Sequence, residues 1–356
     1  MRLPRDGPPL FAARSAFRVA PSLDPPHALF SYPKTPGRTR RVISLLRRHS
    51  REAALLGAIT ALFLLPLFGV DGFYAVGTFR SLAIDNLPVL LAAAGMTLVI
   101  VAGQIDISIG SQFVVGGIAA GLLAKSGLPM PLVVLATLAL GAALGALNGL
   151  LVTAARIPAI IATLATMVLL RNGVLRATGG DWIQNLPPGF QWFGLPSGPA
   201  QYVYLAVAAA LFAAFAWALR HTSAGRAFYA VGCDHEAARR IGLDPSRQVV
   251  AAFAILGVAT ALAALLNFTR YPTIETNAGL GFELKVIAAV VVGGAAITGG
   301  RGSLIGTLLG VILLGSIGTV FTFLHVNPAW EKAIQGAILL VAVVADTAFR
   351  KESARG

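Results

Sequence analysis

Long apolar runs dominate the sequence from about residue 53 onward, and ten of them come near twenty residues in length. A helix needs about twenty apolar residues to cross the roughly 30 Å hydrocarbon core of a lipid bilayer. The chain is 56% hydrophobic and 12% charged, with a mean hydropathy of +0.76, whereas soluble proteins carry about 25% charged residues. These features exclude a soluble enzyme. They predict an all-α fold, a polytopic membrane helix bundle of about ten transmembrane segments.

The segments can be placed approximately from the apolar runs alone. We expect them at about 53–70, 82–102, 107–124, 130–155, 157–170, 200–219, 249–268, 284–299, 303–323 and 329–349. The run at 157–170 is short, and those at 107–124 and 284–299 are interrupted by Gly and polar residues. A membrane protein tolerates such breaks only where the freed backbone groups face protein or water. The sequence therefore predicts that some of the segments are discontinuous.

The positions of Lys and Arg indicate how the segments are oriented, because cytoplasmic loops carry an excess of basic residues. Five Arg crowd against the start of the first run, five lie in the loop 220–248, and the last residues are basic. Ten crossings place all three regions in the cytoplasm, together with Arg156 and Arg301, and leave Lys125, Arg171, Arg176 and Arg270 outside. We expect a multi-pass protein of the bacterial inner membrane with both termini cytoplasmic.

Most of the net charge of +13 belongs to the N-terminal region. Residues 1–51 hold eleven Lys and Arg against two Asp, together with eight of the twenty Pro. We expect a disordered, non-functional basic extension, followed by a transmembrane domain at 52–350 and a short cytoplasmic tail at 351–356. The charge is thus no sign of nucleic-acid binding. Membrane lipid is the partner that the composition requires.

The sequence shows no pattern that would support catalysis. The five His are scattered, the single Cys233 excludes a multi-Cys metal site, and a phosphate-binding GxxxxGK[ST] loop is missing. We therefore expect a transporter and not an enzyme, with no catalytic residue, no metal and no cofactor of its own. An intramembrane enzyme would need a buried nucleophile with its base, and none is visible.

The polar stretch GQIDISIGSQ, residues 103–112, interrupts two apolar halves and is typical of a discontinuous helix. Transporters place solute contacts at such breaks, so its polar side chains are candidates for a translocation path. An alternative is that the Asp106 carboxylate caps the next helix by accepting backbone N–H groups near Ser108 and Ile109. Both roles can coexist. The candidates for the path are Gln104, Asp106, Ser108, Ser111 and, from a later segment, Asn148.

Other polar or glycine-rich features are open to more than one interpretation. A second Gly-rich break at 290–306 leads into a Gly306–Gly310 pair, whose spacing favours close helix packing. Residues 171–199 form the longest external segment, and its Trp182 and Trp192 are typical of interfacial anchors. Polar residues within the spans serve either a central path or hydrogen bonds between helices. They are Asp85, Asn86, Thr163, Thr166 and Glu283.

The loop 220–248 contains a short helix signal. Asp234 can cap a helix that has Glu236 in its first turn, Arg239 and Arg240 in its last, and Gly242 just beyond its end. A helix this short is only marginally stable by itself, and we therefore expect a docking partner to hold it. The alternative is an ordinary solvated loop.

Four stretches in this order resemble a known family over roughly residues 50–350. They are GQIDISIGS, NGLLVTAARIPAIIATLATM, GRAFYAVGCDHEAARRIGL and GFELKVIAAVVVGGAAITGGRGSLIGTLLG. The chain resembles the inner-membrane permease subunits of bacterial ABC sugar importers, the group of ribose, xylose, arabinose, rhamnose and autoinducer-2 permeases. EAARRIG at 236–242 is also similar to the EAA-x3-G core of the importers' coupling loop, although the usual hydrophobic-Pro ending is absent.

The resemblance implies partners and a mechanism. ABC ATPase subunits, which bind the ATP, would dock on the coupling loop, and a periplasmic solute-binding protein would deliver the solute to a pair of permeases. The coupling residues implied are Gly225, Arg226, Asp234, Glu236, Ala237, Ala238, Arg239 and Gly242. The stretches around 156–187 and 327–346 look most similar to autoinducer-2 permeases, followed by rhamnose permeases, which typically pair as two non-identical subunits. We expect autoinducer-2 as the solute, with rhamnose or another pentose or deoxyhexose next.

A rival from another class is a secondary transporter or channel driven by an ion gradient, with Asp106 as the coupling carboxylate. It predicts transport that collapses with the proton or sodium gradient while ATP remains.

Overall fold

The computed structural model describes residues 52–68, 72–327 and 329–353, and their regular structure is helical apart from one isolated bridge between Ile183 and Ile274. The expected basic extension at 1–51 lies outside these residues. In chain order the helices are Glu52–Leu64, η1 (Leu65–Phe68), α2 (Val76–Val101), α3 (Ile109–Lys125), α4 (Met130–Thr153), α5 (Ala159–Thr178), η2 (Gln191–Gly194), α6 (Ser197–His221), α7 (Ser223–Cys233), α8 (His235–Arg240), α9 (Pro245–Phe268), α10 (Phe282–Val292), α11 (Leu304–Phe323) and α12 (Ala329–Ser353).

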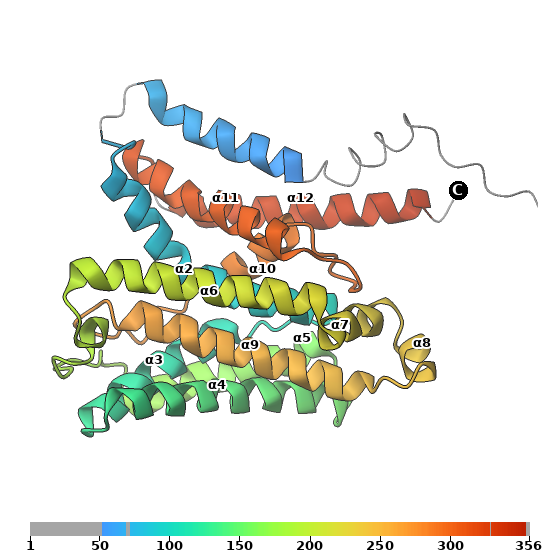
Figure 1. Ribbon diagram of the computed structural model, residues 1–356, viewed down its shortest axis with the longest axis horizontal. Helices are drawn as coiled ribbons and strands as arrows, with labels where there is room; N and C mark the ends of the chain where they lie inside the picture. Colours follow the sequence, from blue (N-terminus) through green and yellow to red (C-terminus); the bar gives the residue numbers. More distant parts are fainter. Residues whose placement is uncertain (1–51, 69–71, 328, 354–356) are drawn as a thin grey trace, which may run out of the picture. The chain divides into compact units, whose positions relative to one another are not determined.

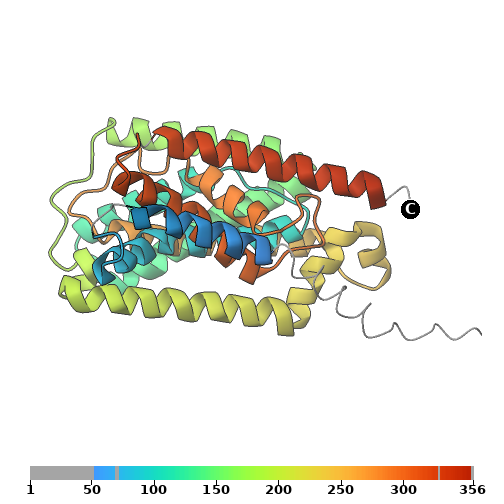
Figure 2. The same ribbon diagram turned by 90° about the horizontal axis from the view of Figure 1, so that it is seen from above.

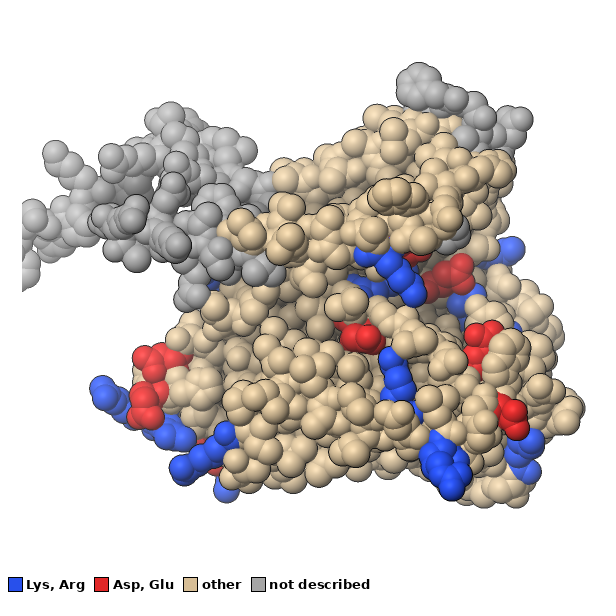
Figure 3. Space-filling view, turned by 180° about the vertical axis from the view of Figure 1, so that it is seen from behind, with Lys and Arg blue, Asp and Glu red and all other residues tan. Residues whose placement is uncertain are grey.

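The predicted helical membrane bundle is confirmed. Among the described residues, six helices are long and apolar enough to cross a membrane, namely α2, α4, α5, α6, α9 and α11. Helix α3 and the first helix are apolar but shorter. Figure 2 shows α6 and α12 along opposite sides of this bundle. Figure 3 shows one face of it, on which Lys, Arg, Asp and Glu form separate groups among a larger surface of other residues.

Three segment boundaries differ from the sequence prediction. Helix α5 continues past residue 170 to Thr178, where Gly179 ends it in the left-handed conformation at φ 67°. Helix α10 stops at Val292 instead of crossing to 299, because Gly293 and Gly294 follow. The predicted loop at 220–248 is largely helical, since α7 precedes the expected short helix.

Helix α9 is the centre of the bundle, where it packs against α2, α3 and α4. Its Phe253, Leu256 and Leu265 are almost completely buried. The contact with α4 is made through glycine: Gly145 lies directly against the Phe253 carbonyl and Gly141 against the Gly257 carbonyl, so neither position has room for a Cβ atom. Small residues that let helix backbones approach are typical of membrane interfaces. Sequence analysis did not single out this stripe.

The second glycine pair behaves as predicted. Gly306 of α11 lies against Gly293 at the end of α10, and Gly310 lies against the carbonyl of Ala289 one turn earlier. The packing interpretation of this GxxxG pair is therefore confirmed. It holds the short helix α10 against the long helix α11.

Helices α3 and α10 are the helical halves of two discontinuous crossings, because each follows a non-helical stretch, 104–108 or 275–281, that enters the bundle from the opposite end. Their N-terminal ends meet, since the ring of Phe113 stacks on that of Phe282 with centroids 4.4 Å apart. From this junction α3 runs toward Lys125 and α10 toward Gly293 at the opposite end (Figure 1). Rises of about 25 Å and about 16 Å, from 1.5 Å per residue, together come close to the roughly 40–45 Å of a bilayer with its headgroups. The junction therefore lies deep within the membrane.

The two ends of the bundle carry different structures (Figure 1). At one end the segment 179–196 folds over the bundle, with Ile183 bridged to Ile274 and the Lys125 ammonium donating to the Gln184 carbonyl at 3.0 Å. At the other end lie α7 and α8, together with the turn at 293–303. In the predicted orientation, the end covered by 179–196 faces the outside and the end with α7 and α8 faces the cytoplasm.

Gly145→Ala tests the central contact. A methyl group at this position would strike the Phe253 carbonyl, so α4 and α9 must separate or distort. We expect the free energy of unfolding to fall by about 1–3 kcal/mol, as for other overpacked cores. Thermal unfolding of the purified protein in detergent micelles measures the change.

The matched control is Gly173→Ala in α5, where nothing lies within 4 Å of the added Cβ. It should leave the unfolding transition unchanged or raise it slightly, because Ala favours helix more than Gly. Equal effects of the two substitutions would show that the α4–α9 contact does not set stability.

Candidate functional site

The chain reverses sharply after α2. Gly103 adopts φ 79°, and the segment that follows it is not helical until α3 begins at Ile109. The backbone at Gly103 lies close to Gly232 of α7 and to Thr298 in the turn after α10. From there the segment runs back into the bundle and brings Asp106 to a fully buried position. The predicted break at 103–112 is therefore present.

Asp106 is the centre of a polar network. Its Oδ1 accepts the backbone N–H of Ser108 at 2.8 Å and the Ser108 hydroxyl at 2.6 Å. Its Oδ2 accepts the side-chain amides of Gln112 at 3.1 Å and Asn148 at 3.3 Å. Both amides also donate to the Ser108 hydroxyl oxygen, at 2.7 and 2.8 Å. The network thus ties the break, the first turn of α3 and helix α4 together.

The structure separates the five predicted path residues. Asp106, Ser108 and Asn148 meet in the network, whereas the Ser111 hydroxyl donates to the Met167 carbonyl of α5 at 2.9 Å. Gln104 is partly exposed on the break, and within the described part of the chain its side chain makes no hydrogen bond to the other four. Gln112 also belongs to the network, although it was not among the predicted path residues. Its position four residues after Ser108, one turn of helix away, was the available signal.

The Asp106 carboxylate behaves as the capping alternative predicted, in that it accepts the Ser108 N–H. With four donors on two oxygens it has little capacity left for a further ligand. The oxygens without a donor among the described residues belong instead to its neighbours, Gln112 Oε1 and Asn148 Oδ1. A buried amide oxygen without a donor is costly, so these two are the groups that a hydroxyl or a water would satisfy.

A second polar cluster surrounds the start of α10. The Glu283 carboxylate packs directly on Gly110 of α3, is 8% exposed, and has no donor for its Oε2 among the described residues. The Arg171 guanidinium of α5 donates to the Gly279 carbonyl at 3.5 Å. Lys285 and Glu331 of α12 form an ion pair at 3.5 Å. Charged groups of α5, α10 and α12 therefore gather around the start of α10.

The capped helix at the other end forms as predicted. Asp234 accepts the N–H groups of Glu236 at 2.8 Å and Ala237 at 3.1 Å, and α8 then runs to Arg240, with Gly242 beyond it at φ 85°. The N–H groups of Ala237 and Glu236 lower the pKa of Asp234. Because the folded pKa is depressed, the cap is fully present above the carboxyl's unfolded pKa and is lost only as the pH falls through the lower folded value.

The remaining predicted coupling residues lie on α7 and α8. Gly225 is buried against the end of α6, Ala238 is buried, and Arg239 pairs with Glu236 at 3.2 Å on the surface. Arg226 is exposed. The apolar Ile241, at 72% exposure, is an addition that sequence analysis missed.

Helix α7 joins α8 to both breaks in the membrane domain. Gly232 lies against the Val101 carbonyl at the end of α2, and Gly300 donates its N–H to that same carbonyl at 2.8 Å. The Tyr229 hydroxyl donates to the Gly302 carbonyl at 2.9 Å. Helix α7 therefore connects α8 both to the segment before α3 and to the segment after α10.

At the end of the bundle covered by the segment 179–196, the two predicted interfacial anchors differ. Trp182 is about half exposed, as expected of an interfacial side chain. The ring of Trp192 instead packs on that of Tyr204 of α6, with centroids 5.0 Å apart, and the backbone N–H of Trp192 donates to the Thr269 carbonyl at 2.7 Å. Within the described residues, no group of three or more His, Cys, Asp or Glu is placed to hold a metal ion.

A helical membrane bundle with two discontinuous crossings and a capped helix at one end is the architecture expected of a transport permease. The chain belongs to the family described as "Branched-chain amino acid transport system / permease component", whose family model matches residues 78–343. It is a multi-pass permease subunit of the ABC importer class, which works with ATPase and solute-binding partners.

Curated relatives cover most of the chain. The autoinducer 2 import system permease protein LsrC of Escherichia coli (strain K12 / DH10B) is 35% identical over 305 residues, 85% of this chain and 89% of the relative. The LsrC of Enterobacter sp. (strain 638) is 36% identical over 312 residues, covering 86% and 89%. That of Salmonella paratyphi B is 35% identical over 309 residues, covering 85% and 88%. No solved structure gives a significant match.

Asp106→Asn tests the network. The substitution keeps one oxygen for Ser108 but turns an NH₂ group toward the amide donors of Gln112 and Asn148. We expect the free energy of unfolding to fall by about 1–3 kcal/mol, the cost of leaving buried donors unpaired. A plain helix cap would tolerate Asn with a small loss. Thermal unfolding in detergent micelles distinguishes the two.

Asp181→Asn in the segment 179–196 is the control, since Asp181 is exposed. It should unfold like the unmodified protein. Unchanged unfolding of Asp106→Asn would mean that the carboxylate only caps α3.

Proposed function

We propose that this permease carries autoinducer-2 into the cytoplasm, with rhamnose or another pentose or deoxyhexose as the next candidates. The observation that supports it is the similarity to LsrC, which extends over 89% of that protein and includes both breaks and the capped helix. Such solutes are small and rich in hydroxyl groups. Unpaired acceptors within the bundle, such as the Gln112 and Asn148 amide oxygens, suit them.

We propose that the solute path runs along the face formed by α5, α10 and α12. The Lys285–Glu331 pair on this face is one-quarter exposed at both side chains. Charged groups within a membrane protein face protein or water, because exposure to lipid costs several kcal/mol. In this proposal the Asp106 network, with Gln104 and Ser111 beside it, forms the α3 part of the path, where the Gln112 and Asn148 amide oxygens would accept solute hydroxyl groups.

A path along an open face needs a second wall. We propose that a second, non-identical permease subunit supplies it. Helix α5 supports this arrangement. It presents exposed apolar side chains such as Ile161 and Leu169, whereas its Thr163 and Thr166 are buried on another face. A periplasmic solute-binding protein would deliver the solute at the end covered by 179–196.

We propose that the ATPase subunit docks on α7 and α8 and binds the ATP, so that this chain holds no cofactor. The exposed Ile241 gives the docking surface an apolar contact between Arg239 and Gly242. The basic residues at this end, including Arg220, Arg226 and Arg247, support a cytoplasmic location for it. Both termini would then be cytoplasmic.

Glu236→Arg tests the coupling proposal. It breaks the ion pair with Arg239 and places a positive charge in the first turn of α8, where the helix dipole disfavours it. We expect loss of co-purification with the ATPase subunit and loss of uptake, while membrane insertion is unaffected. Affinity purification of the complex from membranes provides the measurement.

The matched charge reversal is Glu275→Arg, an exposed residue at the opposite end of the bundle. It should leave ATPase association unchanged. A Glu236→Arg complex that still assembles and transports would refute the assignment of α8.

Uptake into proteoliposomes tests the solute and the energy source together. We expect accumulation of labelled autoinducer-2 only when the partner permease, ATPase subunit, binding protein and ATP are all present. Excess rhamnose should compete weakly or not at all.

Two results would contradict parts of this proposal separately. Uptake driven by a proton or sodium gradient without the ATPase would favour the secondary-transport alternative. ATP-dependent uptake of rhamnose but not autoinducer-2 would correct the solute and leave the class unchanged.

A further inference from the structure

The N-terminal ends of α3 and α10 meet without a side-chain cap. Within the described part of the chain, neither Ser108 at the start of α3 nor Gly281 at the start of α10 supplies one. The two ends are in contact, because Gly110 lies against the Gly279 carbonyl and Gly279 against the Gly110 carbonyl. The first N–H groups of a helix have no partner within it, and each helix end carries about half a positive charge. Two such ends at one place favour an anion.

The Glu283 carboxylate occupies this junction of α3 and α10. Glu283 belongs to the first turn of α10, and its Oε2 lies directly against Gly110 of α3. The side chain is 8% exposed, and Oε2 has no donor among the described residues. A buried carboxylate without a donor is costly unless positive charge surrounds it. The two helix ends supply that charge.

Other charged groups contribute to the balance at the junction. The Arg171 guanidinium of α5 donates to a carbonyl of the junction at 3.5 Å and forms no ion pair within the described residues. The Asp106 carboxylate lies just before α3, where it accepts a backbone N–H at 2.8 Å. The Lys285–Glu331 pair adds no net charge. Two helix ends and one guanidinium are thus balanced by two carboxylates, and removal of Glu283 would leave an excess of positive charge.

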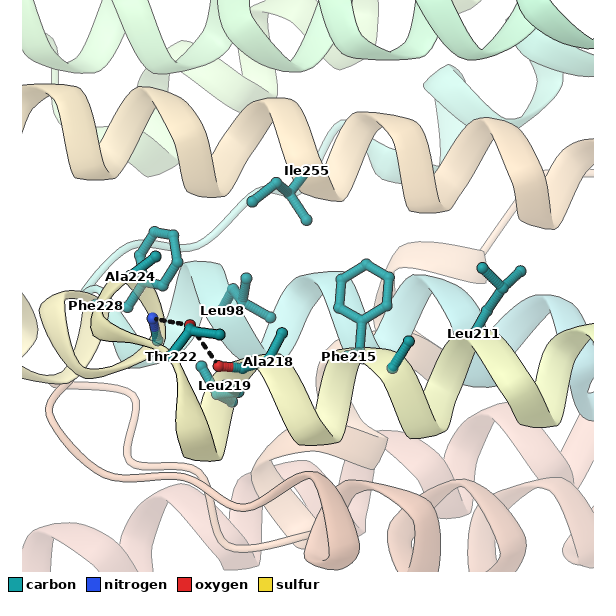
Figure 4. A pocket seen from close by; sticks show the side chains of 11 residues that line it. Leu98, Leu211, Phe215, Ala218, Leu219, Thr222, Ala224, Phe228 and Ile255 are labelled. Carbon is teal, nitrogen blue, oxygen red and sulfur yellow. Dashed lines mark hydrogen bonds between the residues drawn. The ribbon is translucent and has the colours of Figure 1, made fainter.

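The apolar cavity between α2, α6, α7 and α9 is no alternative site for an anion. Figure 4 shows side chains of α6 and α7 around it, with Ile255 of α9 across from them. Thr222 has the one polar side chain in its lining, and the hydroxyl already donates to the Ala218 carbonyl at 2.6 Å and accepts the Gly225 N–H at 3.0 Å. An anion would find no partner there, whereas the junction of α3 and α10 offers two helix ends and Arg171.

We propose that the Glu283 carboxylate fills an anion position at the junction of α3 and α10 and thereby makes the path selective for neutral solutes. This inference rests on the proposed path along α5, α10 and α12. A neutral sugar can donate its hydroxyl groups to the carboxylate. A phosphate ester or carboxylate of the same sugar would instead meet a like charge where little water screens it. Glu283 is thus a specificity-determining residue that rejects anionic relatives of the solute.

The test compares ribose with ribose 5-phosphate, which differ by the charged ester group. Equilibrium dialysis measures the binding of each labelled compound to the purified full-length chain in detergent micelles. We expect the unmodified chain to bind the ester no better than ribose. Glu283→Gln keeps the size of the side chain but removes its charge. It should bind the ester roughly tenfold more tightly, the effect of opening helix N-termini to an anion, while its affinity for ribose changes little.

Three further variants separate charge from space. Glu283→Asp shortens the side chain but keeps its charge, so it should gain no affinity for the ester. Glu275→Gln makes the same change as Glu283→Gln at an exposed residue, and should also have no effect. Arg171→Gln added to Glu283→Gln should remove much of the gain, because a cation is lost from the junction. Thermal unfolding checks that each variant is folded.

No gain in the folded Glu283→Gln variant, or an equal gain in Glu283→Asp, would overturn the inference. Preferential binding of ribose 5-phosphate by the unmodified chain would overturn it whatever the variants do. Failure of the proposed function gives a different pattern. The complete importer would then accumulate neither autoinducer-2 nor rhamnose, while the gain of ester binding in Glu283→Gln would persist.

Discussion

The direct contact between the backbones of α4 and α9 determines much of the architecture. Gly141, Gly145 and Gly149 let α4 approach α9 so closely that backbone atoms of α9 fill the space a methyl would need. Within lipid no hydrophobic gain favours helix association, so this packing has to supply the attraction. Asn148 lies beside Gly149 on the same buried stripe. The distance between α4 and α9 therefore also sets whether Asn148 reaches Asp106 at the break.

The bundle distributes polar groups in two ways. Around Asp106, nearly every donor has an acceptor, and the segment after α2 is held in one geometry. Around Glu283, Lys285 and Glu331, charges are only partly paired and partly exposed. The first arrangement suits a fixed support, because a satisfied network in a low-dielectric interior is rigid. The second suits a surface whose contacts change during transport.

Hydropathy and local signals predict much of this structure, since apolar length and capping residues are local properties. The Asp234 cap and the Gly306–Gly310 packing were predictable from the sequence alone. The end of α5 was not predictable, because Arg171, Asn172 and Arg176 interrupt the apolar run without interrupting the helix. The glycine stripe of α4 and the meeting of α3 with α10 depend on contacts between distant segments. One sequence gives no information about such partners.

Helix α7 contacts the chain just before the crossing that contains α3 and just after the crossing that contains α10, through Gly232 and Tyr229. A displacement of α7 would therefore shift the end of α2 and the turn at 296–302 together. The two discontinuous crossings share this one helix as a support at the α7–α8 end of the bundle. We therefore expect them to change position jointly and not one at a time.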